Sequence, residues 1–278
     1  MRIINLIENT PGIPGCLCEH GLSFYVETGK HRILVDTGAT DAFSVNAEKL
    51  DIDLRQVDMV IISHGHYDHT GGILKFAALN PRAKIWIQRL AGEEYYHKNA
   101  VMEKYIGMDP QVKALPQIEW VDGDRKIDEG IFLFGNVTGR KQWPSGNREL
   151  AVKRNGEFRQ DEFRHEQYLV LEEGKRRILF SGCAHNGILN ILDRYVEIYG
   201  SDPDVLISGF HMNRKNGYRE EDLKLIRDTG TELRKRNTYF YTGHCTGELP
   251  FEILKEVMGD QLHYVHSGEE LCLSCTSC

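Results

Sequence analysis

The sequence predicts an α/β fold in which two β-sheets pack face to face with helices outside, a four-layer αββα sandwich. Short apolar runs rich in β-branched residues recur between Gly, Asp and Asn residues, and segments with helical periodicity lie between them. Strands dominate the first half, and strands alternate with helices in the second. With 278 residues, 41% of them hydrophobic, the chain can bury one sizeable core. We therefore expect one domain over residues 1–278.

The first half is expected to contain seven strands and three helices. In the helix expected from Gly72 to Leu79, the side chains of Ile73, Phe76 and Ala77 share one face. The other two helices are expected at Asp41–Leu50 and Glu93–Tyr105. The strands are expected at Arg2–Ile7, Leu22–Thr28, Arg32–Asp36, Met59–Ser63, Lys84–Gln88, Ile118–Val121 and Ile131–Val137.

The second half again contains predicted strands and helices, after a polar, poorly periodic segment at Asn136–Glu166. Long irregular segments in compact domains are often functional, so we interpret this one as an active-site flap; a mobile surface excursion without a role is the alternative. Helices are expected at Ile188–Tyr199, Glu220–Lys235 and Pro250–Met258. Strands are expected at Tyr168–Glu172, Arg177–Ser181, Asp204–Ser208, Thr238–Thr242 and His263–Val265.

Charge and cysteine content narrow the class of protein. The net charge of −7 is spread along the chain, which argues against a nucleic-acid groove or a polybasic membrane patch and favours a small-molecule substrate. The first ten residues lack an export signal, and no window approaches the roughly 18 apolar residues of a spanning helix. Seven cysteines at irregular spacings fit thiols or metal ligands in a reducing compartment. We expect a cytoplasmic protein; its oligomeric state is left open.

The strongest chemical signal follows the apolar run that begins at Val60. Three imidazoles and a carboxylate lie within six residues, in the order His64, His66, Asp68 and His69. Residues two apart in extended chain point to the same side, so the first two imidazoles can converge on one ion while the other pair faces a second. Without a cation these groups would repel one another on protonation. We predict one or two divalent ions, zinc first, with manganese or iron as alternatives.

Three motifs together resemble the metallo-β-lactamase superfamily. The segment Ser63–Gly72 (SHGHYDHTGG) resembles its H-x-H-x-D-H motif. Arg32–Gly38 (RILVDTG) resembles the short strand and Asp-Thr-Gly that precede the metal loop, and Thr242–Gly247 (TGHCTG) resembles the last histidine motif. The resemblance spans residues 32–247 and implies the metallo-β-lactamase αββα sandwich.

The resemblance also implies a set of metal ligands. His64 and His66 would hold the first ion. Asp68 and His69 would hold the second, which His244 would complete.

Two positions depart from the superfamily pattern. Asn136 stands where many relatives carry a histidine for the first metal, and Cys183 stands where relatives carry an aspartate that bridges the metals. The simplest hypothesis is that His185 takes the place of the missing histidine as a ligand of the first metal. Cys183 is either a thiolate ligand or a small buried residue beneath the site. Loss of the bridging aspartate weakens the expectation of a tightly bound pair of ions.

Two further histidines have a functional context. His211 follows a predicted strand and is expected to act as a substrate ligand, an acid or a hydrogen-bond partner of a ligand; the alternative is a histidine at the edge of the core. His20, in Glu19-His-Gly, is considered for the pocket rim. We expect Asp68 and His211 to be the catalytic residues. The remaining histidines, interpreted as structural, are His31, His97, His165, His263 and His266.

The C-terminal segment Cys272–Cys278 has the C-x-x-C-x-x-C rhythm of iron–sulfur ligation but lacks a fourth cysteine. Cys16, Cys18 or Cys245 would have to supply the fourth thiolate. The alternative is a poorly ordered terminus with reactive thiols. An iron–sulfur cluster is therefore a hypothesis that the sequence leaves incomplete.

Three functions remain after these observations. The first is metal-assisted hydrolysis of a small ester or phosphoester, with Asp68 orienting the water or taking its proton. The second comes from motifs at Glu19–Ser23, Ser181–Gly187, Ser208–Met212 and Thr242–Thr246. They resemble the subgroup that contains 7,8-dihydropterin-6-methyl-4-(β-D-ribofuranosyl)-aminobenzene-5′-phosphate synthases, pterin-joining transferases of methanopterin biosynthesis, and related metal-dependent hydrolases. The third is a redox or metal-responsive binding protein that uses the tail cysteines.

Two other activities of the same fold are not expected. A flavin-linked reductase would need a flavodoxin-like domain, and none is visible. A secreted lactamase would carry an export signal.

Overall fold

A computed structural model of the chain describes residues 1–214 and 217–273. The chain forms two compact units. Unit 1 comprises residues 1–92 and 107–122 with the C-terminal segment from Val265, and unit 2 comprises residues 93–106 and 123–264. Each unit has its own apolar core and its own large sheet. A single domain over residues 1–278 stays a prediction.

Unit 1 is built on a six-stranded sheet. Its first three strands pair antiparallel, and the third of them also begins a run of four parallel strands. All four residues of its central strand β4 are buried, as expected for a parallel strand covered on both faces. In sheet order the strands are β1 (Arg2–Ile7), β2 (Ser23–Glu27), β3 (Arg32–Val35), β4 (Met59–Ile62), β5 (Lys84–Gln88) and β8 (Ile118–Val121).

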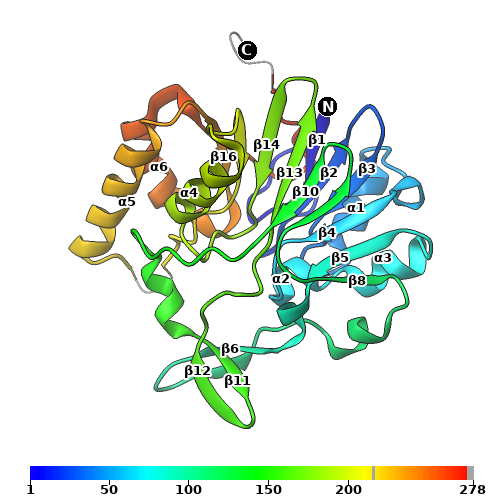
Figure 1. The fold of residues 1–278 in the computed structure, drawn as a ribbon, viewed down its shortest axis with the longest axis horizontal. Helices are drawn as coiled ribbons and strands as arrows, with labels where there is room; N and C mark the ends of the chain where they lie inside the picture. Colours follow the sequence, from blue (N-terminus) through cyan, green and yellow to red (C-terminus); the bar gives the residue numbers. More distant parts are fainter. Residues whose placement is uncertain (215–216, 274–278) are drawn as a thin grey trace. The chain divides into compact units, whose positions relative to one another are not determined.

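Two helices of unit 1 pack against the same side of this sheet, α1 (Ala42–Lys49) and α3 (Ile73–Leu79) (Figure 1). Their side chains Phe43 and Phe76 join Val60 of β4 in one buried cluster. The short helix α2 (Tyr67–Thr70) directly follows the turn after β4. The remaining helical segments of the unit are the 3-10 turns η1 (Leu54–Gln56), η2 (Arg89–Gly92) and η3 (Pro110–Ala114).

Unit 2 contains a seven-stranded sheet in which four neighbouring strands run parallel. The carboxyl ends of neighbouring parallel strands meet at one edge of a sheet, where α/β proteins place their sites. The loops that carry His185, His211 and His244 all leave from this edge. In sheet order the strands are β17 (Leu262–Tyr264), β16 (Tyr239–Thr242), β15 (Val205–Ile207), β14 (Arg176–Phe180), β13 (Tyr168–Glu173), β10 (Ile131–Phe134) and β9 (Arg125–Asp128).

Three helices cover one face of the seven-stranded sheet (Figure 1). Ile191, Ile226 and Leu254, one from each helix, are buried together with Leu206 and Phe240 of the strands. The helices are α4 (Ile188–Tyr199), α5 (Glu220–Leu233) and α6 (Glu248–Met258), and the 3-10 turns of this unit are η4 (Ser145–Glu149), η5 (His244–Thr246) and η6 (Gly259–Gln261).

A separate four-stranded sheet in unit 2 corrects the predictions for two segments, 93–105 and 136–166. The helix predicted at 93–105 is wrong, because this segment forms two strands, one of which pairs with β11. Its aromatic residues fit a half-buried sheet, and Tyr95 stacks on His165 with ring centroids 4.0 Å apart. In sheet order the strands are β12 (Glu157–Gln160), β11 (Leu150–Arg154), β6 (Glu94–Lys98) and β7 (Glu103–Tyr105).

The segment 136–166 is also more regular than predicted. It contains η4 and the hairpin of β11 and β12. The two turn residues, Asn155 and Gly156, both have positive φ, as a two-residue type I′ hairpin requires. The Asn-Gly pair was therefore a readable hairpin signal. Whether the segment acts as a flap stays a prediction.

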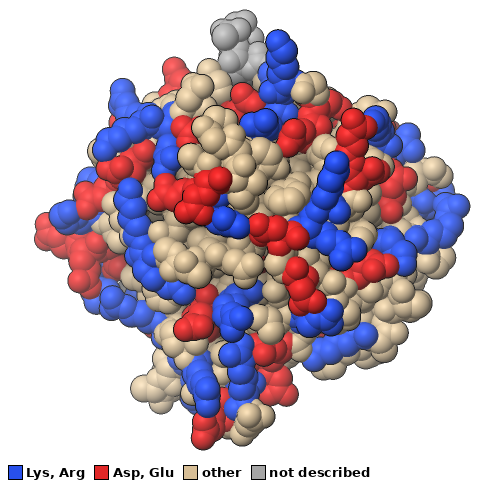
Figure 2. All heavy atoms as spheres, viewed as in Figure 1, with Lys and Arg blue, Asp and Glu red and all other residues tan. Residues whose placement is uncertain are grey.

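The other predicted strands and helices are confirmed within a few residues. Helix α4 has the predicted bounds, and β10 ends at Phe134, three residues before the predicted end at Val137. Within residues 1–214 and 217–273, no helix is both long and apolar enough to cross a membrane. On the face drawn in Figure 2, basic and acidic side chains are interspersed. A cytoplasmic location and the absence of nucleic-acid and membrane partners stay predictions.

Candidate metal centre

The turn after β4 brings the first two predicted ligands together. His64 and His66 are both buried, and the latter is the extended residue that precedes α2. Nε2 of His64 lies 3.1 Å from Nδ1 of His66. Two nitrogens bound to one zinc ion at about 2.0–2.1 Å in tetrahedral geometry would lie about 3.3 Å apart. The two imidazoles are therefore spaced as ligands of a common ion.

A buried carboxylate from the Asp-Thr-Gly motif orients the imidazoles. Asp36 has a left-handed backbone, with φ of 59°, and its Oδ2 accepts hydrogen bonds from Nδ1 of His69 at 2.7 Å and Oγ of Ser63 at 2.7 Å. Since the serine hydroxyl donates to Asp36, its oxygen accepts from Nδ1 of His64 at 2.9 Å. Both imidazoles therefore carry their proton on Nδ1 and the lone pair on Nε2, the form that binds a metal.

The second pair of predicted ligands lies at the start of α2. Oδ2 of Asp68 is 3.7 Å from Nε2 of His69 and 3.4 Å from Nε2 of His20. The side chain of His20 is 49% exposed, whereas His69 is fully buried. His20 therefore lies on the solvent side of the carboxylate, and its place at the rim of a substrate pocket stays a prediction.

Glycines allow the backbone of this turn to pack closely. A Cβ on Gly65 would lie 2.6 Å from the carbonyl oxygen of Ala91, and one on Gly71 would lie 2.0 Å from the carbonyl oxygen of Ala39. Any larger residue would displace the loop that carries the imidazoles.

In unit 2, His185 is held by a polar network. The buried carboxylate of Glu166 accepts hydrogen bonds from the backbone nitrogens of His185 and Asn186, at 2.7 and 2.9 Å, and from the Tyr168 hydroxyl at 2.7 Å. Burial raises the pKa of Glu166. Asn147 accepts from Nδ1 of His185 at 3.1 Å and donates to its carbonyl oxygen at 2.7 Å. As in unit 1, the lone pair of the imidazole lies on Nε2.

His211 and Cys245 lie next to this imidazole. The ring centroids of His185 and His211 are 4.1 Å apart. The backbone nitrogen of His211 donates to Sγ of Cys245 at 3.3 Å, and the ligand atoms of Cys183, His211 and Cys245 all lie within 4.8 Å of one another.

This setting also shifts the pKa of Cys245. Burial raises the pKa of the thiol, but hydrogen bonds with Cys183 and His211 outweigh that effect and, with the nearby His244, lower it well below the ordinary value. From the sequence, Cys245 was considered only as a fourth ligand for the tail cysteines.

The remaining predicted positions differ in outcome. Asn136 is exposed, has φ of 57° and lies near Gly123. It therefore does not belong to the polar network that holds His185. His244 is buried in η5. The proposed fourth thiolates Cys16 and Cys18 belong to unit 1, whereas Cys245 belongs to unit 2. Cys275 and Cys278 lie outside the described residues, and Cys272 is half-buried.

The side chains that hold the imidazoles in place carried no signal in the sequence, apart from Asp36, which belongs to a motif. Ser63 and Asn147 hydrogen-bond imidazole nitrogens, and Glu166 holds the backbone of the His185 loop.

Comparison with known proteins identifies the family. The profile of the metallo-beta-lactamase superfamily matches residues 17–144. The crystal structure of Tm1679, a metal-dependent hydrolase of the beta-lactamase superfamily, matches with a TM-score of 0.82 and 31% identity over 98% of each chain. The chain belongs to the metallo-β-lactamase superfamily. The predicted α/β fold of this superfamily is thereby confirmed.

Two proteins of Methanocaldococcus jannaschii are also similar to this chain. A 7,8-dihydropterin-6-methyl-4-(beta-D-ribofuranosyl)-aminobenzene-5′-phosphate synthase is 26% identical over 97% of this chain and 95% of its own. An uncharacterized protein is 27% identical over 87% of this chain and 89% of its own.

The nitrogen atoms that this chain presents fit the divalent cation that its superfamily implies. His64 and His66 present two nitrogens at the spacing of a shared ion, and the proton of His64 is held on the opposite nitrogen. The metal identity and the catalytic roles of Asp68 and His211 stay predictions. So does the assignment of the metal ligands, which are His64, His66, Asp68, His69, His185 and His244.

Proposed function

We propose that this protein is a metal-dependent hydrolase that acts on a small ester or phosphoester. The observation that carries the proposal is the pair of nitrogens on His64 and His66, 3.1 Å apart, at the end of the buried strand β4. Asp36 and Ser63 fix the tautomers of His64 and His69, so that the Nε2 atom of each imidazole is left with a lone pair. This arrangement supports a role of these Nε2 atoms in binding a cation.

A divalent cation, when bound, lowers the pKa of water by several units and polarises a carbonyl or phosphoryl oxygen. In our proposal His64, His66, Asp68 and His69 are ligands, and the carboxylate of Asp68 also orients the attacking water and accepts its proton. His211 donates a proton to the leaving oxygen. Nε2 of the half-exposed His20 lies 3.4 Å from Oδ2 of Asp68 and limits how this carboxylate can turn.

The test compares chelated protein with protein reloaded with zinc, manganese or iron, using p-nitrophenyl acetate and bis(p-nitrophenyl) phosphate as substrates. Hydrolysis should require the metal, and His66→Ala and Asp68→Asn should lower kcat/KM at least a hundredfold, since each removes a ligand and one also removes the base. His31→Ala, in the turn between β2 and β3, is the control for loss of an imidazole. Undiminished hydrolysis by metal-free His66→Ala would refute the proposal.

Similarity to the dihydropterin synthase over 97% of this chain favours a second candidate, a pterin-joining transferase. Here the same residues would bind a pterin-methyl diphosphate, an aromatic carbon or nitrogen of the second substrate would form a bond to the methylene carbon, and diphosphate would leave. Release of pyrophosphate on incubation with both substrates supports this reaction. Its absence, together with metal-dependent ester hydrolysis, supports the first candidate.

A further inference from the structure

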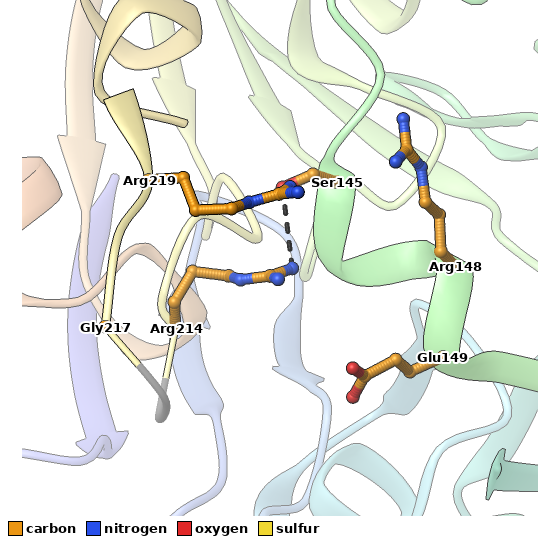
Figure 3. A pocket seen from close by; sticks show the side chains of 6 residues that line it. All are labelled: Ser145, Arg148, Glu149, Arg214, Gly217 and Arg219. Carbon is orange, nitrogen blue, oxygen red and sulfur yellow. Dashed lines mark hydrogen bonds between the residues drawn. The ribbon is translucent and has the colours of Figure 1, made fainter. Parts of the chain in front are cut away.

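Unit 2 contains a cavity of about 350 Å³ that the proposed metal ligands do not line. Three arginines and one glutamate surround it, so its wall carries excess positive charge in a chain whose net charge is −7. In Figure 3 the side chains of Arg214 and Arg219 extend side by side toward Ser145. The lining residues are Ser145, Arg148, Glu149, Arg214, Gly217 and Arg219.

Among the described residues, Arg219 alone of the three arginines forms ion pairs. Arg219 forms ion pairs with Glu221 and Asp222. In the described part of the chain, neither Arg148 nor Arg214 forms an ion pair; the guanidinium of Arg214 contacts the Ser145 hydroxyl at 3.5 Å, and its charge contributes to the lowered pKa of Asp222. That hydroxyl donates to Asp222 at 2.7 Å, so its oxygen faces the guanidinium. Neither of these two guanidinium groups is held in an ion pair by the described residues, so both can contact an anion in the cavity.

The cavity lies beside the imidazole that we propose as the proton donor. Gly146 of η4 marks the contact: a Cβ built there would lie 3.3 Å from Nε2 of His211 and 3.7 Å from Nη1 of Arg214. The next residue, Asn147, is the one that fixes the tautomer of His185. The turn η4 thus borders the arginine cavity and the imidazoles of His185 and His211.

We propose that this cavity binds a phosphoryl group of the substrate, with Arg214 as its main contact and Arg148 as the second. The planar fork of a guanidinium matches two oxygens of a phosphate, which makes arginine better suited than lysine to this task. The inference rests on the proposed function and narrows it: the substrate carries a phosphate or diphosphate close to the bond that is cleaved. Inorganic phosphate and pyrophosphate share the chemistry of this group.

The test measures binding of pyrophosphate and of inorganic phosphate to the purified protein by calorimetry. Arg214→Gln should weaken pyrophosphate binding about tenfold to a hundredfold, since it removes charged hydrogen bonds. Arg148→Gln should weaken it less, and Arg214→Lys should fall between wild type and Arg214→Gln because it keeps the charge but loses the fork. Arg227→Gln, which removes an exposed arginine from α5, is the matched control and should bind as wild type does.

Pyrophosphate affinity that is the same in wild type, Arg214→Gln and Arg148→Gln would overturn the inference. An unfolding midpoint equal to that of wild type shows that each variant is folded. Because binding is measured without turnover, a wild type that binds pyrophosphate through Arg214 but hydrolyses no ester refutes the proposed function alone. Hydrolysis with arginine-independent binding refutes only the phosphoryl pocket.

Discussion

Nδ1 of His69 lies 2.7 Å from Oδ2 of Asp36, and both side chains are buried. The two residues are 33 positions apart, and the left-handed backbone at Asp36 turns its carboxylate under the turn after β4. The same carboxylate accepts from the backbone nitrogen and the hydroxyl of Ser63, at 2.7 Å each. One carboxylate therefore fixes the loop and, directly or through Ser63, the tautomers of two proposed ligands.

Asp36→Asn should weaken metal binding about tenfold to a hundredfold, the usual effect of removing a carboxylate that hydrogen-bonds a ligand histidine. Asparagine tolerates the left-handed backbone at this position, so the fold should persist. Calorimetric titration with zinc measures the effect. Asp41→Asn, at an exposed residue whose side chain makes no capping hydrogen bond, is the control. Equal zinc affinity in Asp36→Asn and wild type would contradict the assigned role.

Gly65→Ala should lower the free energy of unfolding by about 1–3 kcal/mol, because the added Cβ would lie 2.6 Å from the carbonyl oxygen of Ala91. Urea denaturation measures the change. Gly92→Ala is the control, since its nearest neighbour would be an atom of the Trp120 ring at 3.4 Å. A Gly65→Ala variant as stable as Gly92→Ala would show that the turn is less tightly packed than described.

Glu166→Gln should also destabilise the protein, by about 1–3 kcal/mol. Glu166 accepts from two backbone nitrogens and from side chains of Asn186 and Tyr168, whereas an amide nitrogen cannot accept any of these bonds. Urea denaturation again gives the free energy, with the exposed Glu162→Gln as control. No difference between the two variants would mean that the network does not stabilise the His185 loop.

The pH dependence of stability should include a contribution from His263. Its pKa is lowered by burial and by the nearby Lys255. A lowered pKa in the folded state means that stability is present above the unfolded value of about 6.5 and is lost as the pH falls through the folded value. His263→Phe keeps the stacking on Tyr241 but should lack this loss. A stability difference between variant and wild type that is equal at pH 7.5 and pH 5 would contradict this contribution.

The sequence predicts the parts of the site that are local. His64, His66, Asp68 and His69 follow one buried strand, so alternation of side chains and ligand chemistry suffice to identify them. Asn147 and Arg214 could not be found this way. Each acts through a contact across the tertiary structure, the former with His185 and the latter at the cavity beside His211.

The errors in secondary structure have a similar origin. The segment 93–105 lacks proline and glycine and is helical only by weak periodicity. Its strand β6 depends on pairing with β11, more than 50 residues later, and β7 pairs with β6. The turn at Asn155 and Gly156, in contrast, carried a local signal that identifies a hairpin.

The most direct test is the metal content of the purified protein, measured by elemental analysis together with zinc affinity. The wild type should contain at least one equivalent of zinc, manganese or iron per chain. The double variant His64→Ala/His66→Ala should lose that equivalent and bind zinc at least a hundredfold more weakly. A wild type that contains none of these metals and does not bind zinc, or a double variant that retains the full equivalent, would contradict a metal centre at the end of β4.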